Sequence, residues 1–468
     1  MNLATALRVS DRAVVAIVGG GGKTSALYRL AAELAEPGLG RVLLATTAKM
    51  LLPQEHEADG LFINADFDAI AQRLESTIPY LRRILVAPDI MESPEGWKLT
   101  SVPLDWPKRL AALVRVSNVL VEADGSRHLP FKAPADYEPP IPPDTDLVVV
   151  VVGLDVLGQP LDETHVHRPE IVARLTGAKL GDVVDAGMIA RALAHPQGGL
   201  KNIPAGARAV ALLNKVTEEN LDAGRRIADA VLADGPYEAV LLGAVQDADP
   251  IRERRTRLGA VVLAAGEARR FGGAKLTLPW QDTTLVGHAL RLAGASGAAE
   301  TVLVTGAHAE AVREAVSNTP PFPGEGQGEG SHGRPHFTII HNNAWQEGLS
   351  TSVKTGLGAL SERVQAALFL LADQPTVTPS IVQAIVQRYY ETAAPIVVPT
   401  YHGKRGNPTL FDRSLWAELM AVIGDQGGRG LIERYRDRVA FVEVGAAAAL
   451  DVDTPDDYHR LTNPSPSP

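Results

Sequence analysis

The stretch VVLAAGEARRFGGAKL, residues 261–276, decides the fold of the second half of the chain. Its apolar run ends at Ala265, and Gly266 then allows a tight turn. The cationic residues Arg270 and Lys275 follow in the same loop. Backbone amides of a glycine-bearing loop can approach phosphate closely, and arginine and lysine neutralise its charge. The stretch predicts a strand and a triphosphate-binding loop; a surface turn with incidental cations is the alternative interpretation.

Further apolar runs predict that this strand belongs to a doubly wound α/β domain spanning residues 258–462. Short runs that do not alternate are typical of parallel strands covered on both faces. They are GAVVLAA (259–265), TVLVTG (301–306), FTIIHN (337–342), AALFLLA (366–372) and PIVVPT (395–400), with helical patterns at 284–295 and 379–391.

The first half of the chain predicts a second doubly wound domain, residues 1–246, with a parallel sheet. Its strand-like runs are AVVAIV (13–18), RVLLAT (41–46), NVLVEA (118–123), LVVVVV (147–152), RAVALL (208–213) and AVLLG (239–243). VVAIVGGGGKTS at 14–25 is similar to a P-loop, although the full pattern needs glycine where this chain has Ile17. We expect an anion site made by the amides of Gly19, Gly20, Gly21 and Gly22, with Lys23 on phosphate and Thr24 on Mg²⁺. A purely structural glycine turn is the alternative.

Three other segments of this half carry candidate polar residues. In NVLVEADGSR (118–127), Asp124 is expected to help bind the nucleotide through a metal-bound water, and Glu122 is the neighbouring alternative. LLNKV (212–216) is similar to the Asn-Lys of guanine-recognising loops, but Thr217 stands where an aspartate is expected. HVHRPE (165–170) suggests either a metal pair, His165 and His167, or surface and phosphate-contacting histidines.

Composition limits the classes of protein to which the chain can belong. Its 468 residues predict two or three domains, and its formal net charge of −10 argues against a nucleic-acid partner. The absence of cysteine excludes disulfides and thiolate metal sites. We expect a cytoplasmic protein without a signal peptide or membrane span, a charged linker at 247–257, a flexible loop at 320–335 and a disordered tail at 463–468.

Two carboxylates are candidates for a metal site in the C-terminal domain. Asp373 follows an apolar strand, at the edge where open α/β sheets bind ligands, and Mg²⁺ prefers a few carboxylates together with substrate phosphates. Asp453 in DVDTPDDY (451–458) is the second candidate, and Asp451 stays open as an alternative. Each aspartate could instead cap a helix.

Six motifs of this half, in order, resemble the molybdenum cofactor cytidylyltransferases (MocA) of the MobA-like nucleotidyltransferase superfamily, over residues 258–462. They are 261–276, NNAWQEGLSTSVKTGL (342–357), FLLADQPTVT (369–378), RGNPTLF (405–411), GDQGGRGLI (424–432) and 451–458. The resemblance implies a Rossmann-like, GT-A-like fold. It implies catalytic roles for Lys275, Arg270 and Asp373, and nucleotide contacts for Leu263, Ala264, Ala265, Gly266, Gly272, Lys275, Ser350 and Ser352. The two serines could instead cap a helix. Asn407 stands where many relatives have histidine.

This resemblance implies transfer of CMP from CTP to Mo-molybdopterin with Mg²⁺, releasing pyrophosphate. Transfer to another acceptor and a non-catalytic cofactor chaperone are the alternatives. Residues 10–245 resemble the YqeC family of selenium-dependent hydroxylase accessory proteins, through GGGGKT, TTAKM (46–50), VEADGSR and HVHRPE. We therefore expect ATP or GTP in the N-terminal domain, and a molybdenum hydroxylase apoenzyme as a partner.

Overall fold

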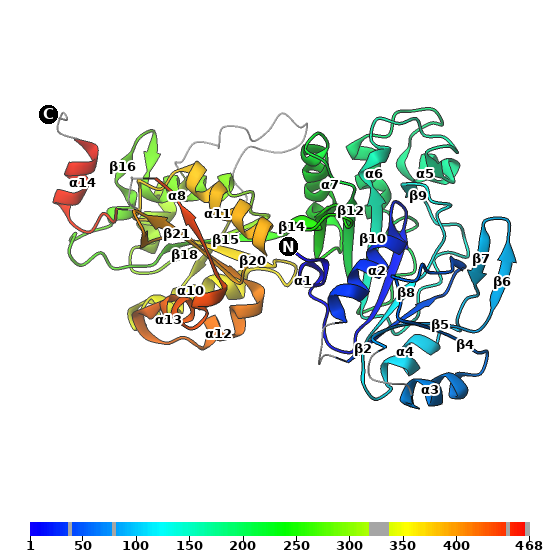
Figure 1. Ribbon diagram of the computed structural model, residues 1–468. Coiled ribbons are helices and arrows are strands. Elements are labelled where there is room, and N and C mark those ends of the chain that lie inside the picture. The colour runs from blue at the N-terminus through cyan, green and yellow to red at the C-terminus, as the bar shows by residue number, and fades with distance from the viewer. Residues whose placement is uncertain (36–39, 77–80, 318–336, 446–449, 464–468) are drawn as a thin grey trace. The chain divides into compact units, whose positions relative to one another are not determined.

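A computed structural model describes the chain at residues 1–35, 40–76, 81–317, 337–445 and 450–463 (Figure 1). The chain forms two compact units, Met1–Arg255 and Thr256–Pro468. The expected flexible loop at 320–335 and nearly all of the expected tail lie outside the described residues. In the described part, no helix combines the length and apolar character needed to cross a lipid bilayer.

The N-terminal unit is built on one large sheet, whose described part has nine strands. Their order is β14 (Ile251–Thr256), β13 (Ala239–Gly243), β12 (Arg208–Asn214), β10 (Leu147–Gly153), β1 (Val14–Gly19), β8 (Val116–Glu122), β2 (Arg41–Thr46), β5 (Arg83–Ala87) and β4 (Gly60–Ile63). The strands from β13 to β4 are parallel to their neighbours. All six apolar runs predicted as strands are therefore confirmed.

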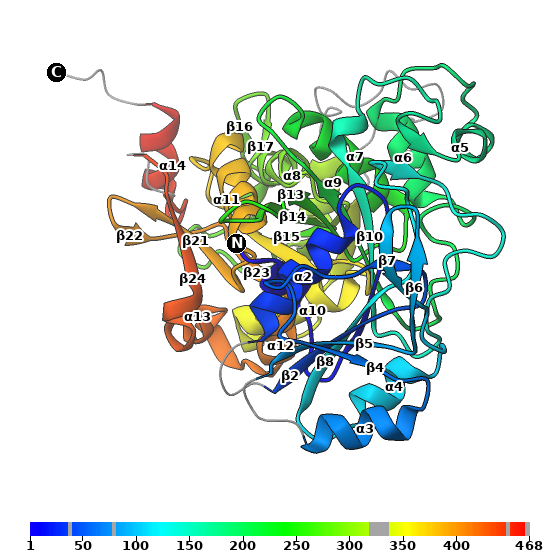
Figure 2. The same cartoon turned by 45° about the vertical axis from the view of Figure 1, so that its right-hand side comes forward.

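Helices cover both faces of this sheet. In β1, Val14 and Val18 pack toward the helices α3 (Phe67–Ser76), α4 (Trp106–Ala111), α5 (Pro169–Thr176), α6 (Ala186–Ala194) and α7 (Leu221–Asp234). Val15 and Ile17 pack toward α1 (Leu3–Leu7) and α2 (Lys23–Leu34) on the opposite face. Figure 2 shows α3 and α4 together beside β2, β4 and β5. A strand buried on both faces explains why β1 is continuously apolar, and the doubly wound prediction is confirmed.

Smaller sheets lie beside the main one. β3 (Met50–Leu51), β7 (Gly96–Leu99) and β6 (Ile90–Ser93) form an antiparallel sheet. The two-residue strands β9 (Phe131–Lys132) and β11 (Val166–His167) pair in parallel, with His167 opposite Lys132. This pairing brings the HVHRPE segment next to the chain that follows β8.

The expected linker at 247–257 is wrong for residues 251–256, which form the edge strand β14. Ile251 is buried in the apolar core, and its N–H donates to the Met1 carbonyl at 3.1 Å. Arg254 is only 1% exposed. Its guanidinium can be buried because it donates to the Ala6 carbonyl at 2.9 Å and to Glu238 Oε1 at 2.7 Å. A charged side chain of this segment is thus buried and hydrogen-bonded, which is why the charged composition predicts a linker although the segment is a strand.

The C-terminal unit contains a mixed sheet, whose described part has eight strands. Along the sheet lie β19 (Phe337–His341), β18 (Glu300–Thr305), β15 (Leu258–Ala264), β20 (Ala366–Leu371), β23 (Thr409–Asp412), β21 (Ile396–Tyr401) and β22 (Lys404–Arg405), and β24 (Val439–Glu443) pairs with β21. β19, β18, β15 and β20 are parallel to one another, and together with β21 they confirm all five predicted strands of this half. β23 is antiparallel to both of its neighbours.

Both faces of this sheet are also covered. Leu258, Ala260 and Val262 of β15 face α8 (Leu285–Ala295), α9 (Ala309–Ser317) and α11 (Pro379–Thr392). Val261 and Leu263 face α10 (Leu349–Ala359), α12 (Trp416–Ala421) and α13 (Arg429–Arg434). The hairpin of β16 (Pro279–Trp280) and β17 (Thr283–Thr284) precedes α8, and α14 (Pro455–Thr462) closes the unit. The loop after β15 therefore lies at the carboxyl edge of the parallel strands.

Candidate functional sites

Lys275 lies where three segments of the C-terminal unit meet. Its Nζ donates to Asp373 Oδ2 at 2.8 Å and to the Val452 carbonyl at 2.7 Å, and lies 3.6 Å from Asp453 Oδ1. The lysine side chain is only 11% exposed, while that of Asp453 is 47% exposed. The loop after β15, the end of β20 and the segment before α14 thus converge on one ammonium group.

Arg270 joins the same cluster from the exposed side. Its Nη1 donates to Asp453 Oδ2 at 3.3 Å, and the guanidinium is largely exposed. The structure therefore brings together Arg270, Lys275, Asp373 and Asp453, as the sequence led us to expect. The Val452 N–H donates to the Asp373 carbonyl at 3.0 Å, which fixes the two acidic segments side by side.

Asp451 differs from Asp453 in its surroundings. Gln374 Nε2 donates to Asp451 Oδ1 at 2.7 Å, so a protein amide already engages this carboxylate. Burial raises the pKa of Asp451, and the charges of Asp373 and Asp453 raise it further. Asp451 is the more exposed residue of the two, whereas Asp453 lies beside Lys275 and Arg270, so the two carboxylates differ in their partners and the sequence alternative between them stays open. The contact of Gln374 with this site was not predicted from the sequence, although Gln374 directly follows the candidate metal ligand Asp373.

The loop after β15 presents free backbone donors. In the described part of the chain, the amides of residues 266–270 have no protein acceptor. A Cβ on Gly266 would meet nothing within 4 Å, so space is open beside it. Gly272 acts differently, because its N–H donates to the Ala268 carbonyl at 3.0 Å and its φ is +80°. Gly272 therefore closes the loop, and the open amides precede it.

The two candidate serines lie inside α10, whose N-cap is Gly348, so the alternative cap role is wrong for both. Ser352 is buried, and its Oγ accepts from Asn342 Nδ2 at 3.0 Å at the wall of the cleft described next. Ser350 Oγ is buried without a partner in the described residues and does not line that cleft. Of these two serines, Ser352 therefore lines the cleft and Ser350 does not.

Two neighbouring cavities open at this edge of the sheet. The first cavity has a volume of about 660 Å³ and is lined by Leu263, Ala265, residues 266–269, Ser352 and Asp373. The second cavity, of about 310 Å³, is lined by apolar side chains together with Asn407 and residues 425–429. Leu263, Leu349, Leu371 and Asp425 line both. The expected nucleotide-binding residue Ala264 is buried within β15 and lines neither cavity.

In the N-terminal unit, the glycine loop is packed against other backbone segments. A Cβ on Gly19 would lie 2.2 Å from the Val151 carbonyl oxygen, and one on Gly21 would lie 2.2 Å from Gly153 N. A Cβ on Gly20 would be 2.8 Å from the Leu129 carbonyl oxygen, and one on Gly22 would be 2.4 Å from Asn214 Nδ2. Backbone atoms therefore exclude a Cβ at Gly19, Gly20 and Gly21, and the φ of +119° favours glycine at Gly22.

Most of the expected amide donors of this loop are already used. Gly19 N–H donates to both Asp124 carboxylate oxygens at 3.1 Å, Gly20 N–H to the Val151 carbonyl at 2.9 Å and Gly21 N–H to the Leu129 carbonyl at 3.0 Å. The expected anion site is therefore wrong for the amides of Gly19, Gly20 and Gly21. The donors that remain lie at Gly22 and the first turn of α2, which has no side-chain cap.

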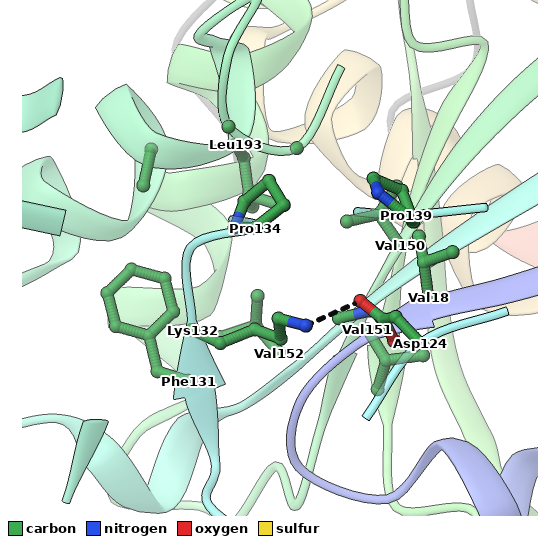
Figure 3. Close-up of a pocket in the computed structure, with 14 residues that line it drawn as sticks. Val18, Asp124, Phe131, Lys132, Pro134, Pro139, Val150, Val151, Val152 and Leu193 are labelled. Carbon is green, nitrogen blue, oxygen red and sulfur yellow. Dashed lines mark hydrogen bonds and ion pairs between the residues drawn. The ribbon is translucent and has the colours of Figure 1, made fainter. Parts of the chain in front are cut away.

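A chain of ion pairs connects the glycine loop to the HVHRPE segment. Lys23 Nζ lies 3.4 Å from Asp124 Oδ1, and Lys132 Nζ donates to Asp124 Oδ2 at 2.9 Å and to Glu138 Oε2 at 2.8 Å. Arg168 Nη2 donates to Glu138 Oε1 at 2.9 Å. Figure 3 shows Lys132 reaching Asp124 beside a cavity of about 30 Å³, which has room for water but is too small for a nucleotide.

This network gives Asp124 a role different from the expected one. Its carboxylate is 2% exposed and is engaged by two lysines and a backbone amide, so it is not open to a metal-bound water. Glu122, the alternative, accepts from Thr24 Oγ1 at 2.8 Å. Burial raises the pKa of Glu122. Glu122 is thus the carboxylate beside the first turn of α2, and sequence reasoning missed Lys132 and Glu138.

The two histidines of HVHRPE have different surroundings. His165 Nδ1 lies 2.8 Å from Asp162 Oδ1. Burial, and after it the charges of the neighbouring cations Arg168 and Lys132, together lower the pKa of His167 to about 4. Among the residues that the structure describes, no group of three or more acidic or histidine side chains is arranged to hold a metal.

A cavity of about 390 Å³ lies beside the first turn of α2. It is lined by Gly22, Ser25, Asn214, Lys215 and loop residues 244–247. Asn214 Nδ2 donates to the Gly21 carbonyl at 2.8 Å, and its Oδ1 accepts from Val245 N at 3.0 Å. The Asn-Lys pair of LLNKV is therefore next to the glycine loop, and Asn214 ties three loops together.

Comparison with known proteins assigns each half of the chain. The YqeC protein family model matches residues 15–170, and the MobA-like NTP transferase domain model matches residues 260–439. YqeC of Escherichia coli (strain K12), described as uncharacterized, is 32% identical over 247 residues, covering 52% of this chain and 91% of that protein. The molybdenum cofactor cytidylyltransferase of the same organism is 26% identical over 203 residues, covering 43% of this chain and 93% of that protein.

A solved structure, Rv0371c from Mycobacterium tuberculosis H37Rv, is 32% identical and covers 44% of this chain and 97% of its own, with a TM-score of 0.37. Both expected resemblances are confirmed by the matched families. The chain therefore belongs to the YqeC family through its N-terminal half and carries a MobA-like nucleotidyltransferase domain in its C-terminal half.

Proposed function

We propose that the C-terminal unit transfers CMP from CTP to Mo-molybdopterin and releases pyrophosphate. The observation that carries this proposal is the convergence of Lys275, Asp373 and Asp453 beside the open amides of residues 266–270. Positive charge and free N–H donors at the carboxyl edge of a parallel sheet suit a nucleoside triphosphate. The similarity to a molybdenum cofactor cytidylyltransferase supports CTP and molybdopterin as the substrates.

The acidic pair fits a divalent cation. Asp373 Oδ2 and Asp453 Oδ1 both lie near Lys275 Nζ, at 2.8 and 3.6 Å, so the two carboxylates face the same ammonium group. Mg²⁺ is usually held by one or two carboxylates with substrate phosphates completing its coordination. In this proposal Asp373 and Asp453 hold Mg²⁺, which neutralises phosphate charge when it is bound.

The residues of the cleft would position two phosphates for in-line transfer. An oxygen of the acceptor's terminal phosphate attacks the α-phosphorus of CTP. The bond between the α-phosphorus and the oxygen that bridges it to the β-phosphorus then breaks, and pyrophosphate leaves. In this proposal the loop amides and the exposed Arg270 would bind the departing pyrophosphate. Lys275 holds both aspartates in place and supplies charge that the low solvent exposure strengthens.

The test is pyrophosphate release by the full chain given CTP, Mg²⁺ and Mo-molybdopterin. Asp373→Asn keeps the size of the side chain and removes its charge, so turnover should fall by about 100-fold or more. Asp437→Asn, at an exposed position in the 3₁₀ turn Arg436–Arg438, is the matched control. Near-normal turnover by Asp373→Asn would exclude its metal role.

For the N-terminal unit we propose binding of ATP or GTP at the first turn of α2, in support of molybdenum hydroxylase maturation. The uncapped turn, Thr24 with Glu122, and the cavity beside Gly22 and Asn214 support this assignment. Lys23 now donates to the Gly19 carbonyl at 2.8 Å, so phosphate binding requires that it reorient. Titration with fluorescent ATP and GTP analogues tests the site, and Lys23→Met should abolish binding.

A further inference from the structure

The motif GDQGGRG (424–430) has no role in the proposed transfer of CMP, yet it forms one wall of the second cavity. Its backbone is packed in place. A Cβ on Gly348 would lie 2.8 Å from Gly424 C, and a Cβ on Gly428 would lie 2.3 Å from the Phe411 ring. The motif therefore builds a fixed edge against the start of α10 and against an aromatic side chain.

The remaining walls of the second cavity are apolar and partly aromatic. Phe369 and Phe411 are buried and meet edge to face, with ring centroids 5.9 Å apart. Leu419 and Ile432 complete this part of the lining. Pockets of about 300 Å³ or more with apolar walls and few polar groups are typical of sites for small organic ligands. A flat ring system fits such walls better than a phosphate or a sugar does.

Asp425 stands where the two cavities meet, because it lines both. Its Oδ1 accepts from the Leu349 N–H at 3.2 Å, and its Oδ2 has no protein partner in the described part of the chain. A carboxylate accepts hydrogen bonds and donates none, so it selects ligands with adjacent N–H groups. Cytosine offers one amino group next to an acceptor nitrogen, whereas a 2-amino-4-oxopyrimidine offers two adjacent donors.

We propose that the second cavity holds the fused rings of the pterin acceptor and that Asp425 accepts from its ring N–H and 2-amino group. This inference rests on the proposed function, since it assigns the acceptor to one cavity and CTP to the other. Because the first cavity contains the open amides and Asp373, a pterin in the second cavity would extend its phosphate-bearing tail toward them. Asn407 lies in the lining of the same cavity and supplies a further polar contact.

The experiment compares two probes that differ only at ring position 2. Pterin-6-carboxylate carries the amino group, whereas lumazine-6-carboxylate carries an oxygen there and offers a different edge to a carboxylate. Their dissociation constants for the full chain are measured by ligand fluorescence, and that of CTP is measured on the same samples. The wild type should bind the pterin about tenfold more tightly, which is the worth of one well-made hydrogen bond to a charged group.

Asp425→Asn is the deciding variant, because its amide oxygen can still accept from Leu349 N–H and preserve the fold. The pterin preference should fall to near unity, and the dissociation constant of CTP should change by less than that of the pterin. Asp437→Asn, an exposed aspartate of the same unit, should keep the preference. A preference that survives in Asp425→Asn overturns the inference, as does absence of pterin binding by the wild type. Weaker CTP binding with unchanged pteridine binding also overturns it, because cytosine then occupies the cavity.

Pyrophosphate release separates this inference from the proposed function. If the preference depends on Asp425 but CTP and Mo-molybdopterin yield no pyrophosphate, the cavity assignment stands and the proposed transfer fails. If pyrophosphate is released at the wild-type rate by Asp425→Asn at limiting acceptor, the transfer stands and the cavity assignment fails.

Discussion

Lys275 is the residue on which the C-terminal site depends most, because its ammonium group joins three segments of the chain. Lys275→Met keeps the length of the side chain and leaves Asp373 and Asp453 without a cation between them. We expect pyrophosphate release to fall by roughly 100-fold or more, since charge neutralisation in a cleft contributes several kcal/mol. Arg313→Gln, which changes an exposed cation on α9, is the control. A loss of less than threefold in Lys275→Met would contradict the assignment.

The sequence predicted this cluster because its residues sit in motifs at strand ends. It could not predict Gln374 as the partner of Asp451, or the Val452 carbonyl as an acceptor for Lys275, because these contacts depend on how the chain returns after β24. In the N-terminal unit, the motif suggested Asp124 for a metal. The fold instead surrounds Asp124 with two lysines that motif spacing does not reveal.

Glu138 makes the N-terminal unit sensitive to acid. Burial opposes its ionisation, but hydrogen bonds from Arg168 and Lys132 outweigh burial and lower the pKa from 4.5 to about 2. A carboxyl whose pKa is lower in the folded state stabilises the fold above pH 4.5 and loses that contribution as the pH falls toward 2. Its contribution at neutral pH should be about 2 kcal/mol, allowing for partial solvent screening.

Glu138→Gln should therefore lower the unfolding midpoint of this unit at pH 7 and flatten its dependence on pH between 4.5 and 2. Calorimetry of the full chain across this range measures both effects. Glu163→Gln, at an exposed position nearby, should leave the profile as in the wild type. A variant with the wild-type slope would show that Glu138 does not control the acid response.

At the scale of elements, the two glycine-bearing loops serve opposite purposes. The loop after β1 is packed from all sides, and an added Cβ at Gly21 would meet Gly153 N at 2.2 Å with φ at +77°. Gly21→Ala should destabilise the N-terminal unit by about 3 kcal/mol, because overpacking and a strained φ add together. Its unfolding midpoint should drop clearly, whereas that of Gly125→Ala, which meets nothing within 4 Å, should not.

The loop after β15 has free space beside Gly266, so a substitution of this glycine can change ligand binding without destabilising the unit. A Cβ at Gly266 meets nothing within 4 Å and projects beside amides without acceptors in the described residues. Gly266→Ala should leave the unfolding midpoint within about 1 °C of the wild type. The KM for CTP should rise severalfold, because the methyl group occupies space that a phosphate needs. An unchanged KM would place the triphosphate elsewhere.

Strand prediction worked where burial on both faces makes a run apolar, as in β1, β10 and β15, and failed at β14. In β14, Glu253 and Arg254 are buried because they pair with Arg225 and Glu238. A search for apolar runs misses a strand whose buried side chains are paired charged residues. The antiparallel direction of β23 was equally hidden, since direction depends on the connection and not on the strand's own residues.

At the scale of the whole molecule, β14 determines where the N-terminal unit ends. A chain of residues 1–246, the expected domain, would lose Ile251 from the core and the partners that β14 gives to Met1 and Glu238. A chain of residues 1–256 keeps all of them. We expect the longer chain to unfold at a midpoint several degrees higher, because a buried ion pair and a core isoleucine each contribute a few kcal/mol.

Calorimetry of the two N-terminal chains decides where this boundary falls. Arg254→Met in the 1–256 chain separates the ion pair from the strand, since methionine fills much of the same space. The unfolding midpoint of this variant should lie between those of the 1–246 and 1–256 chains. Ile251 and the Met1 pairing remain in it. Glu238 loses its ion pair with Arg254 but keeps the one with Arg208, at 2.6 Å. Equal midpoints for the 1–246 and 1–256 chains would mean that β14 adds nothing to this unit, and the boundary near residue 246 would then be restored.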